Sequence, residues 1–316
     1  MVLAAPPLAP RYPWGWRRRD SLALLLPMEE GVLVIDGPLG TELLARGVPT
    51  PLPGWSAHAL ETHPEVVEGV HRDYARAGAR LHTTNTFRTR SRVFPQQWEL
   101  LARRAVELAR RAVCDGQAEA PAGVRIAGSI APLEDCYRPD LSPARSDVAA
   151  CRREHGALAA VLADAGSDLL LCETFPDIAE GLTAARAARE TGLETWLSFT
   201  PGPEGDLLSP RDVSEGAKRA VDLGVSAVLV NCVPARSALA FVEAIAEALE
   251  GSEVRLGCYA NAGQPDDLMG WTSDPGAPER YVARVREWVE AGARIVGGCC
   301  GTSISHVAAL AREFAS

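Results

Sequence analysis

The feature that most constrains the fold is an alternation of short apolar runs with helix-like stretches, which repeats eight times from residue 31 onward. The apolar runs have the length and the β-branched content of strands, and they cover 32–36, 80–86, 124–130, 168–173, 195–200, 227–232, 254–259 and 294–299. Stretches rich in Ala, Arg and Glu with helical periodicity lie between them, for example 65–77, 97–113, 148–165 and 239–249. Apolar strands separated by helices predict a parallel sheet that is covered by helices.

Eight such units in about 285 residues favour a single (β/α)8 barrel, the TIM barrel, over an open doubly wound sheet. No Gly-x-Gly-x-x-Gly sequence follows the first strand, and the chain has no Gly-Lys-Ser/Thr phosphate loop. Long loops rich in Pro and Gly follow strands at 131–147, 201–211 and 260–278, whereas the loops before strands are short. We therefore expect the functional site at the carboxyl ends of the strands.

The first 27 residues stand outside this alternation. Arg17-Arg18-Arg19 and the apolar run 21–26 imitate parts of a secretion signal, but the run is short and ends at Pro27 without a small-x-small cleavage site. We expect residues 1–27 to be a disordered N-terminal extension and residues 28–316 to form the barrel domain.

Charge and cysteine content limit the partners and the compartment. The formal net charge is -9 and no basic run occurs after the first twenty residues, so we expect small-molecule substrates and neither a nucleic acid nor a membrane as partner. No stretch approaches the roughly 18 apolar residues of a membrane span. Of the eight cysteines, Cys172, Cys232 and Cys299 lie in or at the end of apolar strands, which favours a reduced, cytoplasmic protein. The oligomeric state stays open.

The last strand ends in a turn that is suited to a metal. Gly297 and Gly298 precede two adjacent cysteines, Cys299 and Cys300, and Cys232 ends another apolar strand. Three thiolates on zinc leave one tetrahedral position open, which is typical of catalytic zinc. The alternatives are small buried core cysteines and a vicinal disulfide, but core packing requires neither the doublet nor the glycines.

Polar residues end several other strands, among them Asp36, Thr84, Asn85, Glu173, Asn231 and Asn261. A carboxylate at the end of an apolar strand is costly to bury unless it meets a cation, and the cationic group of a substrate is one such partner. The simpler alternative for Asp36 and Glu173 is that each caps the following helix or turn.

These residues together suggest alkylation of a thiol. A substrate thiol, whose ordinary pKa is about 8.5, could fill the open metal position and become a thiolate nucleophile. Four sulfur anions around zinc would also attract a cationic electrophile. The competing hypothesis is a barrel without catalysis, whose structural or sensory metal takes its fourth ligand from Cys136 or Cys258.

The motifs also resemble the homocysteine S-methyltransferase family from Asp36 to about Ala308. The matching motifs are Asp36-Gly37-Pro38-Leu39-Gly40-Thr41-Glu42-Leu43, Thr84-Asn85-Thr86-Phe87, Cys172-Glu173-Thr174, Val230-Asn231-Cys232, Tyr259-Ala260-Asn261-Ala262-Gly263 and Gly297-Gly298-Cys299-Cys300-Gly301-Thr302. The resemblance implies a barrel with one zinc per chain on Cys232, Cys299 and Cys300, homocysteine as methyl acceptor, and no catalytic residue beyond the zinc-activated thiol. It implies a substrate-binding set of Asp36, Gly37, Thr84, Asn85, Glu173, Asn231 and Asn261.

Two departures from the family pattern concern the substrates, the first the amino acid and the second the methyl donor. Pro38 stands where many members have a second glycine, which removes a backbone N–H from the first loop. The loop 131–139 lacks the glycine- and tyrosine-rich form of the members that use betaine or S-methylmethionine. We expect a stand-alone enzyme with a sulfonium donor, S-methylmethionine or S-adenosylmethionine. Betaine, a methylated corrinoid or folate donor, and another thiol acceptor are the alternatives.

Overall fold

The structure is a computed structural model that describes residues 31–117, 120–262 and 277–314. The predicted N-terminal extension, residues 1–27, and most of the predicted loop 260–278 lie outside these residues, so both stay predictions. In the described part of the chain, no helix is both long enough and apolar enough to span a membrane.

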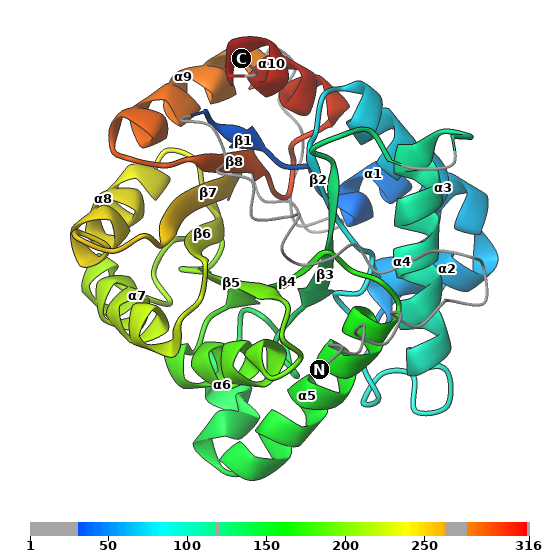
Figure 1. Ribbon diagram of the computed structural model, residues 1–316, viewed down its shortest axis with the longest axis horizontal. Coiled ribbons are helices and arrows are strands. Elements are labelled where there is room, and N and C mark those ends of the chain that lie inside the picture. The colour runs from blue at the N-terminus through cyan, green and yellow to red at the C-terminus, as the bar shows by residue number, and fades with distance from the viewer. Residues whose placement is uncertain (1–30, 118–119, 263–276, 315–316) are drawn as a thin grey trace, which may run out of the picture. The chain divides into compact units, whose positions relative to one another are not determined.

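Eight parallel strands form the sheet, and their order is β1-β8-β7-β6-β5-β4-β3-β2. Their bounds are Leu33–Val34 (β1), Leu81–Thr83 (β2), Arg125–Ile130 (β3), Leu169–Phe175 (β4), Glu194–Phe199 (β5), Ala227–Pro234 (β6), Arg255–Asn261 (β7) and Ile295–Gly298 (β8). A parallel bridge between Ile35 and Leu81 joins β1 to β2 and closes the ring (Figure 1). The predicted (β/α)8 barrel is therefore confirmed.

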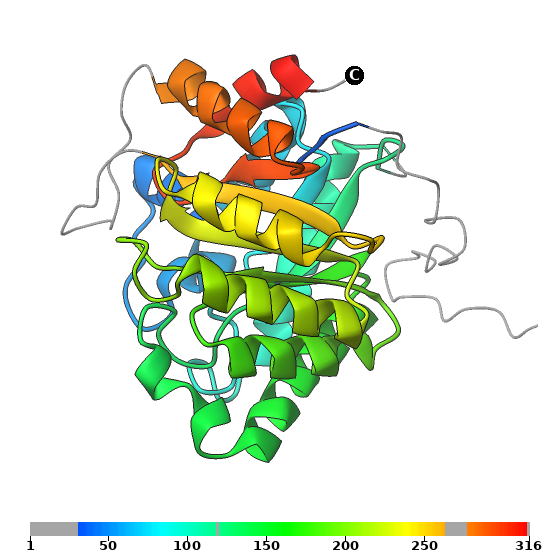
Figure 2. The ribbon, with the colours of Figure 1, turned by 90° about the vertical axis from the view of Figure 1, so that its left-hand side faces the viewer.

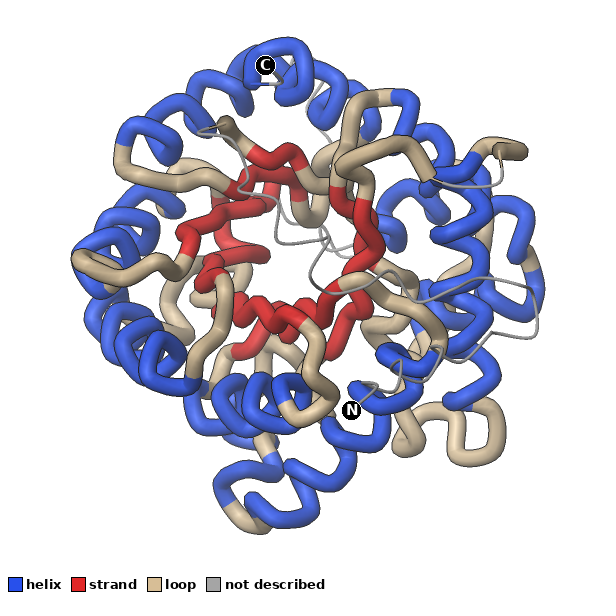
Figure 3. The backbone as a smooth tube through the Cα atoms, viewed as in Figure 1, coloured by secondary structure: helices blue, strands red, loops and turns tan. Residues whose placement is uncertain are grey.

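The helices surround the ring of strands, as the views along and across it show (Figures 2 and 3). They are α1 (Leu39–Ala45), α2 (Ala59–Thr62), α3 (Pro64–Arg76), α4 (Trp98–Cys114), α5 (Val148–Asp164), α6 (Ile178–Arg189), α7 (Pro210–Leu223), α8 (Ala238–Ala248), α9 (Ala277–Glu290) and α10 (Ile304–Phe314). Short 3-10 helices cover Trp55–His58, Pro139–Leu141 and Pro143–Arg145.

Local sequence explains where these helices begin and end. Helix α7 begins with a capping box in which Ser209 and Asp212 bond each other's backbone N–H, and Pro210 fills its first position. It ends at Gly224, whose φ of 80° is the left-handed conformation that glycine tolerates best. Because capped helix ends of this kind stop the helix sharply, the turn into the next strand is short. The long loops lie on the opposite face, at the carboxyl ends of the strands.

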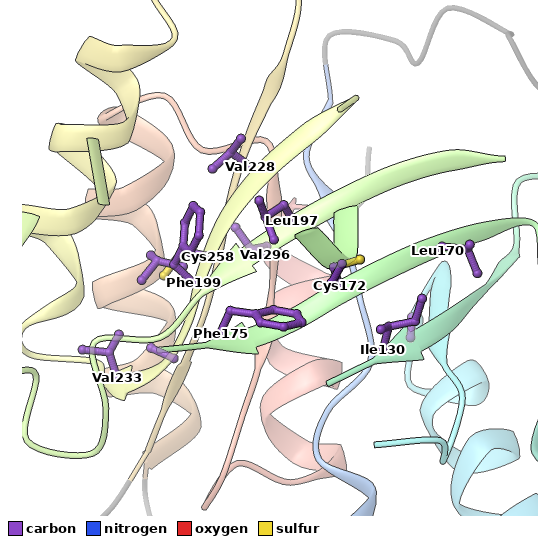
Figure 4. Close-up of a cluster of buried hydrophobic side chains, with 14 of the residues drawn as sticks. Ile130, Leu170, Cys172, Phe175, Leu197, Phe199, Val228, Val233, Cys258 and Val296 are labelled. Carbon is purple, nitrogen blue, oxygen red and sulfur yellow. The ribbon is translucent and has the colours of Figure 1, made fainter. Parts of the chain in front are cut away.

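The two hydrophobic clusters that contain strand residues pack the barrel. One contains only strand residues, such as Leu169, Leu171 and Trp196, and therefore fills the inside of the ring. The other joins strand residues of the opposite pleat to helix residues, so it lies between strands and helices. Cys172 and Cys258 belong to this outer cluster (Figure 4). Both are therefore packing residues on the side of the sheet that faces the helices.

Candidate functional site

Three cysteine sulfurs meet at the carboxyl ends of β6 and β8. Cys232 Sγ lies 3.2 Å from Cys299 Sγ and 3.9 Å from Cys300 Sγ. Ligands of a tetrahedral zinc with Zn–S bonds of about 2.3 Å are roughly 3.8 Å apart, so the three sulfurs have the spacing and the chemistry of a thiolate zinc site. All three thiols are free, and they form one of the groups of described residues that could hold a metal.

The three thiols also need a cation if they are to ionise together. The contact with Cys299 is the largest cause that raises the pKa of Cys232 well above its ordinary value, and burial adds to it. The pKa of Cys300 is raised as well, chiefly by its contact with Cys232. Thiols that obstruct each other's ionisation in this way become thiolates readily when a dipositive metal enters between them.

Close packing explains why glycines occupy positions 297 and 298, at the end of β8. A Cβ on Gly298 would lie 2.1 Å from Thr302 Oγ1, and a Cβ on Gly297 would lie 2.3 Å from Ile35 Cγ1. Thr302 uses the room to donate its hydroxyl to the carbonyl of Cys299 at 2.8 Å. The turn that carries two of the three thiols is thus fixed by contacts which a larger residue would prevent.

Cys232 reaches the site through an irregular backbone. Its φ is 55°, and the register of β6 against β7 shifts between Asn231 and Pro234. Strand β4 has the same irregularity, because the register shifts between Cys172 and Phe175 and Thr174 has a φ of 63°. Left-handed conformations are strained in residues other than glycine and cluster at functional sites. Here the two irregular residues lie at the carboxyl ends of β4 and β6, on the face of the barrel where the three sulfurs meet.

Asn231 links these two irregular strand ends. Its Oδ1 accepts hydrogen bonds from the backbone N–H of Thr174 at 3.1 Å and from Ser198 Oγ at 2.7 Å, and its Nδ2 donates to Thr174 Oγ1 at 2.8 Å. The side chain is fully buried. Asn231, predicted to bind substrate, thus spends its amide on holding the residue after Glu173, and it directly precedes Cys232.

Glu173 is buried near the end of β4, where two hydroxyl groups surround its carboxylate. Its carboxylate accepts hydrogen bonds from the hydroxyl of Ser129 and, at 3.0 Å, from the hydroxyl of Tyr259. Burial raises the pKa of Glu173 in spite of these bonds. It caps no helix, because Asp177 provides the N-cap of α6.

Asp36 is the second buried carboxylate at the carboxyl ends of the strands. Thr83 donates to it from its backbone N–H at 2.8 Å and from its hydroxyl at 3.0 Å, and one nitrogen of each of His71 and His82 lies within 4.8 Å of a carboxylate oxygen. Burial raises the pKa of Asp36 well above its ordinary value, and repulsion from Glu173 contributes. Two buried acids that repel each other favour a cation between them.

Of the remaining predicted substrate-binding residues, Asn261 has a side chain that the described part of the chain leaves unused, whereas Thr84, Asn85 and Gly37 are involved in contacts within the protein. Asn261 is buried, and both atoms of its side-chain amide lack a hydrogen-bond partner among the described residues, so this amide is a candidate to bind a ligand. Thr84 and Asn85 are engaged by the protein: Thr84 Oγ1 accepts from the N–H of Ser129, and Asn85 exchanges two hydrogen bonds with Ser56. Gly37 allows close approach of Tyr74, whose hydroxyl would be 2.6 Å from an added Cβ.

Sequence analysis did not identify one residue of the site, Tyr137. The hydroxyl of Tyr137, in the loop that follows β3, lies 3.1 Å from Cys232 Sγ. Its neighbour Cys136, a predicted alternative fourth ligand, is buried, and burial raises its pKa to about 12. Neither Cys136 nor Cys258 belongs to the group that Cys232 forms with Cys299 and Cys300. The position of the loop after a strand was the signal that could have directed attention to Tyr137.

Comparison with known proteins gives consistent matches over nearly the whole chain. A family model described as homocysteine S-methyltransferase matches residues 33–314. The homocysteine S-methyltransferase of Escherichia coli (strain K12) is 35% identical over 93% of this chain and 98% of its own length. The homocysteine S-methyltransferase YbgG of Bacillus subtilis is 31% identical over 89% of this chain and 95% of its own.

Related sequences and solved structures extend the comparison. A selenocysteine methyltransferase of Astragalus bisulcatus is 30% identical over 85% of this chain and 88% of its own length. The crystal structure of the homocysteine methyltransferase MmuM from Escherichia coli in its metallated form has a TM-score of 0.76 at 28% identity, and the match covers 93% of this chain and 100% of that one.

Proposed function

Because the chain belongs to the homocysteine S-methyltransferase family and is an enzyme that methylates homocysteine, we propose that it acts with a zinc ion on Cys232, Cys299 and Cys300 and with a sulfonium methyl donor. The proposed zinc site rests on one observation: the sulfurs of Cys299 and Cys300, at the end of β8, both lie within 3.9 Å of Cys232 Sγ in β6. Bound zinc supplies the positive charge that favours the thiolate form of the acceptor at neutral pH.

Two carboxylates provide the place for the amino group of homocysteine. Asp36 and Glu173 are both buried, burial raises the pKa of each, and repulsion from Glu173 adds to the rise at Asp36, so an ammonium group near them would relieve an unfavourable charge arrangement. Ser129 and Tyr259 orient Glu173 by donating hydrogen bonds to it. The amide of Asn261, which has no hydrogen-bond partner among the described residues, can bond another polar group of the amino acid. The product in this reading is methionine.

Electrostatics favours a cationic methyl donor. The zinc centre and the acceptor together would carry four sulfur anions against two positive charges, and the chain as a whole has a formal net charge of -9. A sulfonium, S-methylmethionine or S-adenosylmethionine, is therefore the proposed donor. A structural four-cysteine metal site is disfavoured, because Cys258 packs in the outer hydrophobic cluster. Since all eight cysteines are free thiols, we propose a reducing, cytoplasmic compartment.

The test supplies purified protein with L-homocysteine and, separately, S-methylmethionine, S-adenosylmethionine, betaine or methyltetrahydrofolate, and detects methionine by mass spectrometry. We expect methionine from a sulfonium donor, loss of the product after the metal is removed with a chelator, and recovery when zinc is added back. Methionine from betaine or methyltetrahydrofolate alone would overturn the proposed donor. Full activity after verified metal removal would overturn the proposed zinc.

A further inference from the structure

Among the described residues outside the cysteine group, Tyr137 is the one whose side chain hydrogen-bonds one of the three sulfurs. Its hydroxyl is 3.1 Å from Cys232 Sγ, whereas in the described part of the chain the other side-chain hydrogen bonds of these sulfurs join them to one another. A phenol with an ordinary pKa of about 10 keeps its proton at neutral pH, and a thiolate can only accept. When Cys232 is a metal-bound thiolate, Tyr137 must therefore be the donor.

The loop around Tyr137 is held by several hydrogen bonds. Before the tyrosine, buried Glu180 of α6 accepts a hydrogen bond from the N–H of Leu133 at 2.8 Å, and the Arg90 guanidinium donates to the carbonyl of Glu134 at 3.1 Å. At the tyrosine itself, Asp135 accepts the backbone N–H of Tyr137 at 2.8 Å. The hydroxyl is thus held over Cys232 by a loop with defined anchors and does not reach it by chance.

Cys232 is also the sulfur that most needs an external support. Cys299 and Cys300 sit in one turn whose backbone is bonded to β7, since the N–H of Cys299 donates to Ala260 at 2.9 Å and the carbonyl of Cys300 accepts from Ala262 at 3.0 Å. Cys232 comes from a different strand, β6, with a strained φ of 55°, and Thr200 Oγ1 donates to its carbonyl at 3.3 Å. Groups that hydrogen-bond a metal ligand fix its orientation and tune its donor strength.

We propose that Tyr137 is a positioning residue of the metal site, whose hydroxyl donates to the Cys232 thiolate and thereby sets the place and the donor strength of that ligand. The inference rests on the proposed zinc site. It assigns a function to the loop after β3, the segment that departs from the family pattern in sequence. It also predicts that the three thiolates are unequal, because one of them shares its electron density with an O–H group.

The test compares Tyr137→Phe with wild type in metal binding. Phenylalanine keeps the ring and removes the hydrogen bond, so we expect zinc affinity, measured by competition with a chromophoric chelator, to fall roughly 10- to 100-fold. In the Co2+-loaded protein we expect the sulfur-to-cobalt charge-transfer absorption to move to longer wavelength, because the sulfur regains the electron density it gave to the hydroxyl. The thermal unfolding midpoint of the metal-free variant should stay close to wild type.

Arg138→Ala is the matched control, since this exposed neighbour in the same loop pairs with Asp140 and not with a sulfur. It should keep wild-type zinc affinity and absorption. Unchanged affinity and absorption in Tyr137→Phe, or the same changes in Arg138→Ala, would overturn the role of Tyr137. If the wild-type protein binds neither zinc nor Co2+, the proposed metal site fails, and the inference fails with it.

Discussion

Cys232 Sγ lies 3.2 Å from Cys299 Sγ although 67 positions separate the two residues in the sequence. The contact follows from the barrel, in which β7 alone lies between β6 and β8 and all three strands point the same way. Their carboxyl ends therefore meet at one edge, and a metal held there joins the ends of β6 and β8 across β7. Metal content is thus the most direct measure of whether this part of the site is correctly assigned.

The first prediction is that purified protein carries about one zinc per chain and that Cys299→Ala and Cys300→Ala each lose most of it. Two remaining thiolates without a third protein ligand bind zinc weakly. Elemental analysis of each variant measures the loss. Cys258→Ala is the control, because Cys258 lies in the outer hydrophobic cluster and should not affect the metal. Full retention of zinc in both turn variants would contradict the assigned site.

The second prediction concerns Asn231, whose buried amide is hydrogen-bonded to Thr174 and Ser198. Asn231→Ala removes the bonds that hold Thr174 beside Glu173 and loosens the residue before Cys232. We expect zinc affinity and homocysteine affinity to fall together, and the free energy of unfolding to fall by about 1–3 kcal/mol, because buried partners lose their hydrogen bonds. Titration calorimetry with zinc and with homocysteine measures both affinities. A loss of homocysteine binding alone would instead indicate direct contact with substrate.

Strand-end positions made much of the site predictable from sequence. Cys232, Glu173 and the Cys299–Cys300 pair each end an apolar run, and parallel strands bring such ends together. Side-chain direction at irregular ends was not predictable. The run 80–86 becomes a strand only over Leu81–Thr83, because the chain then turns to bond Asn85 to Ser56. The contact of Tyr137 with Cys232 depends on the path of a long loop, which apolar periodicity does not encode.

The third prediction concerns stability in acid. His71 and His82 are buried side by side, with ring centroids 6.2 Å apart, and burial lowers the pKa of His71 to about 3 and that of His82 to about 4. In the unfolded chain a histidine titrates near about 6.5. As the pH falls from 7 to 5, the unfolded chain gains protons that the folded protein does not bind. The free energy of unfolding should therefore fall, by roughly 2 kcal/mol for His82 alone.

His82→Leu isolates this contribution, since leucine fills a similar volume and does not titrate. Urea unfolding at pH 7 and at pH 5 should show a drop in the free energy of unfolding that is smaller in the variant than in wild type. The comparison cancels the carboxyl groups that titrate in both proteins. An equal drop in the two proteins would mean that His82 is not kept neutral by the fold.

The last prediction separates recognition of the substrate from binding of the metal. Glu173→Gln keeps the shape of the side chain and its place beside Ser129 and Tyr259, but it removes the charge that would pair with the ammonium group of homocysteine. Loss of a charge-assisted hydrogen bond should weaken homocysteine binding by on the order of 1.5–3 kcal/mol, or roughly 10- to 150-fold. Zinc content should not change, because Glu173 is not among the sulfur ligands.

A thiol without an amino group provides the control for Glu173→Gln. 3-Mercaptopropionate can bring its sulfur to the same metal but offers no ammonium to the carboxylate, so the variant and the wild type should bind it about equally in titration calorimetry. The ratio of the two thiol affinities therefore reports the contact between the carboxylate and the amino group, separately from the metal. Loss of zinc in the variant, or equal weakening of both thiols, would mean that Glu173 supports the metal or the fold, and the ammonium site would then have to be sought nearer Asp36.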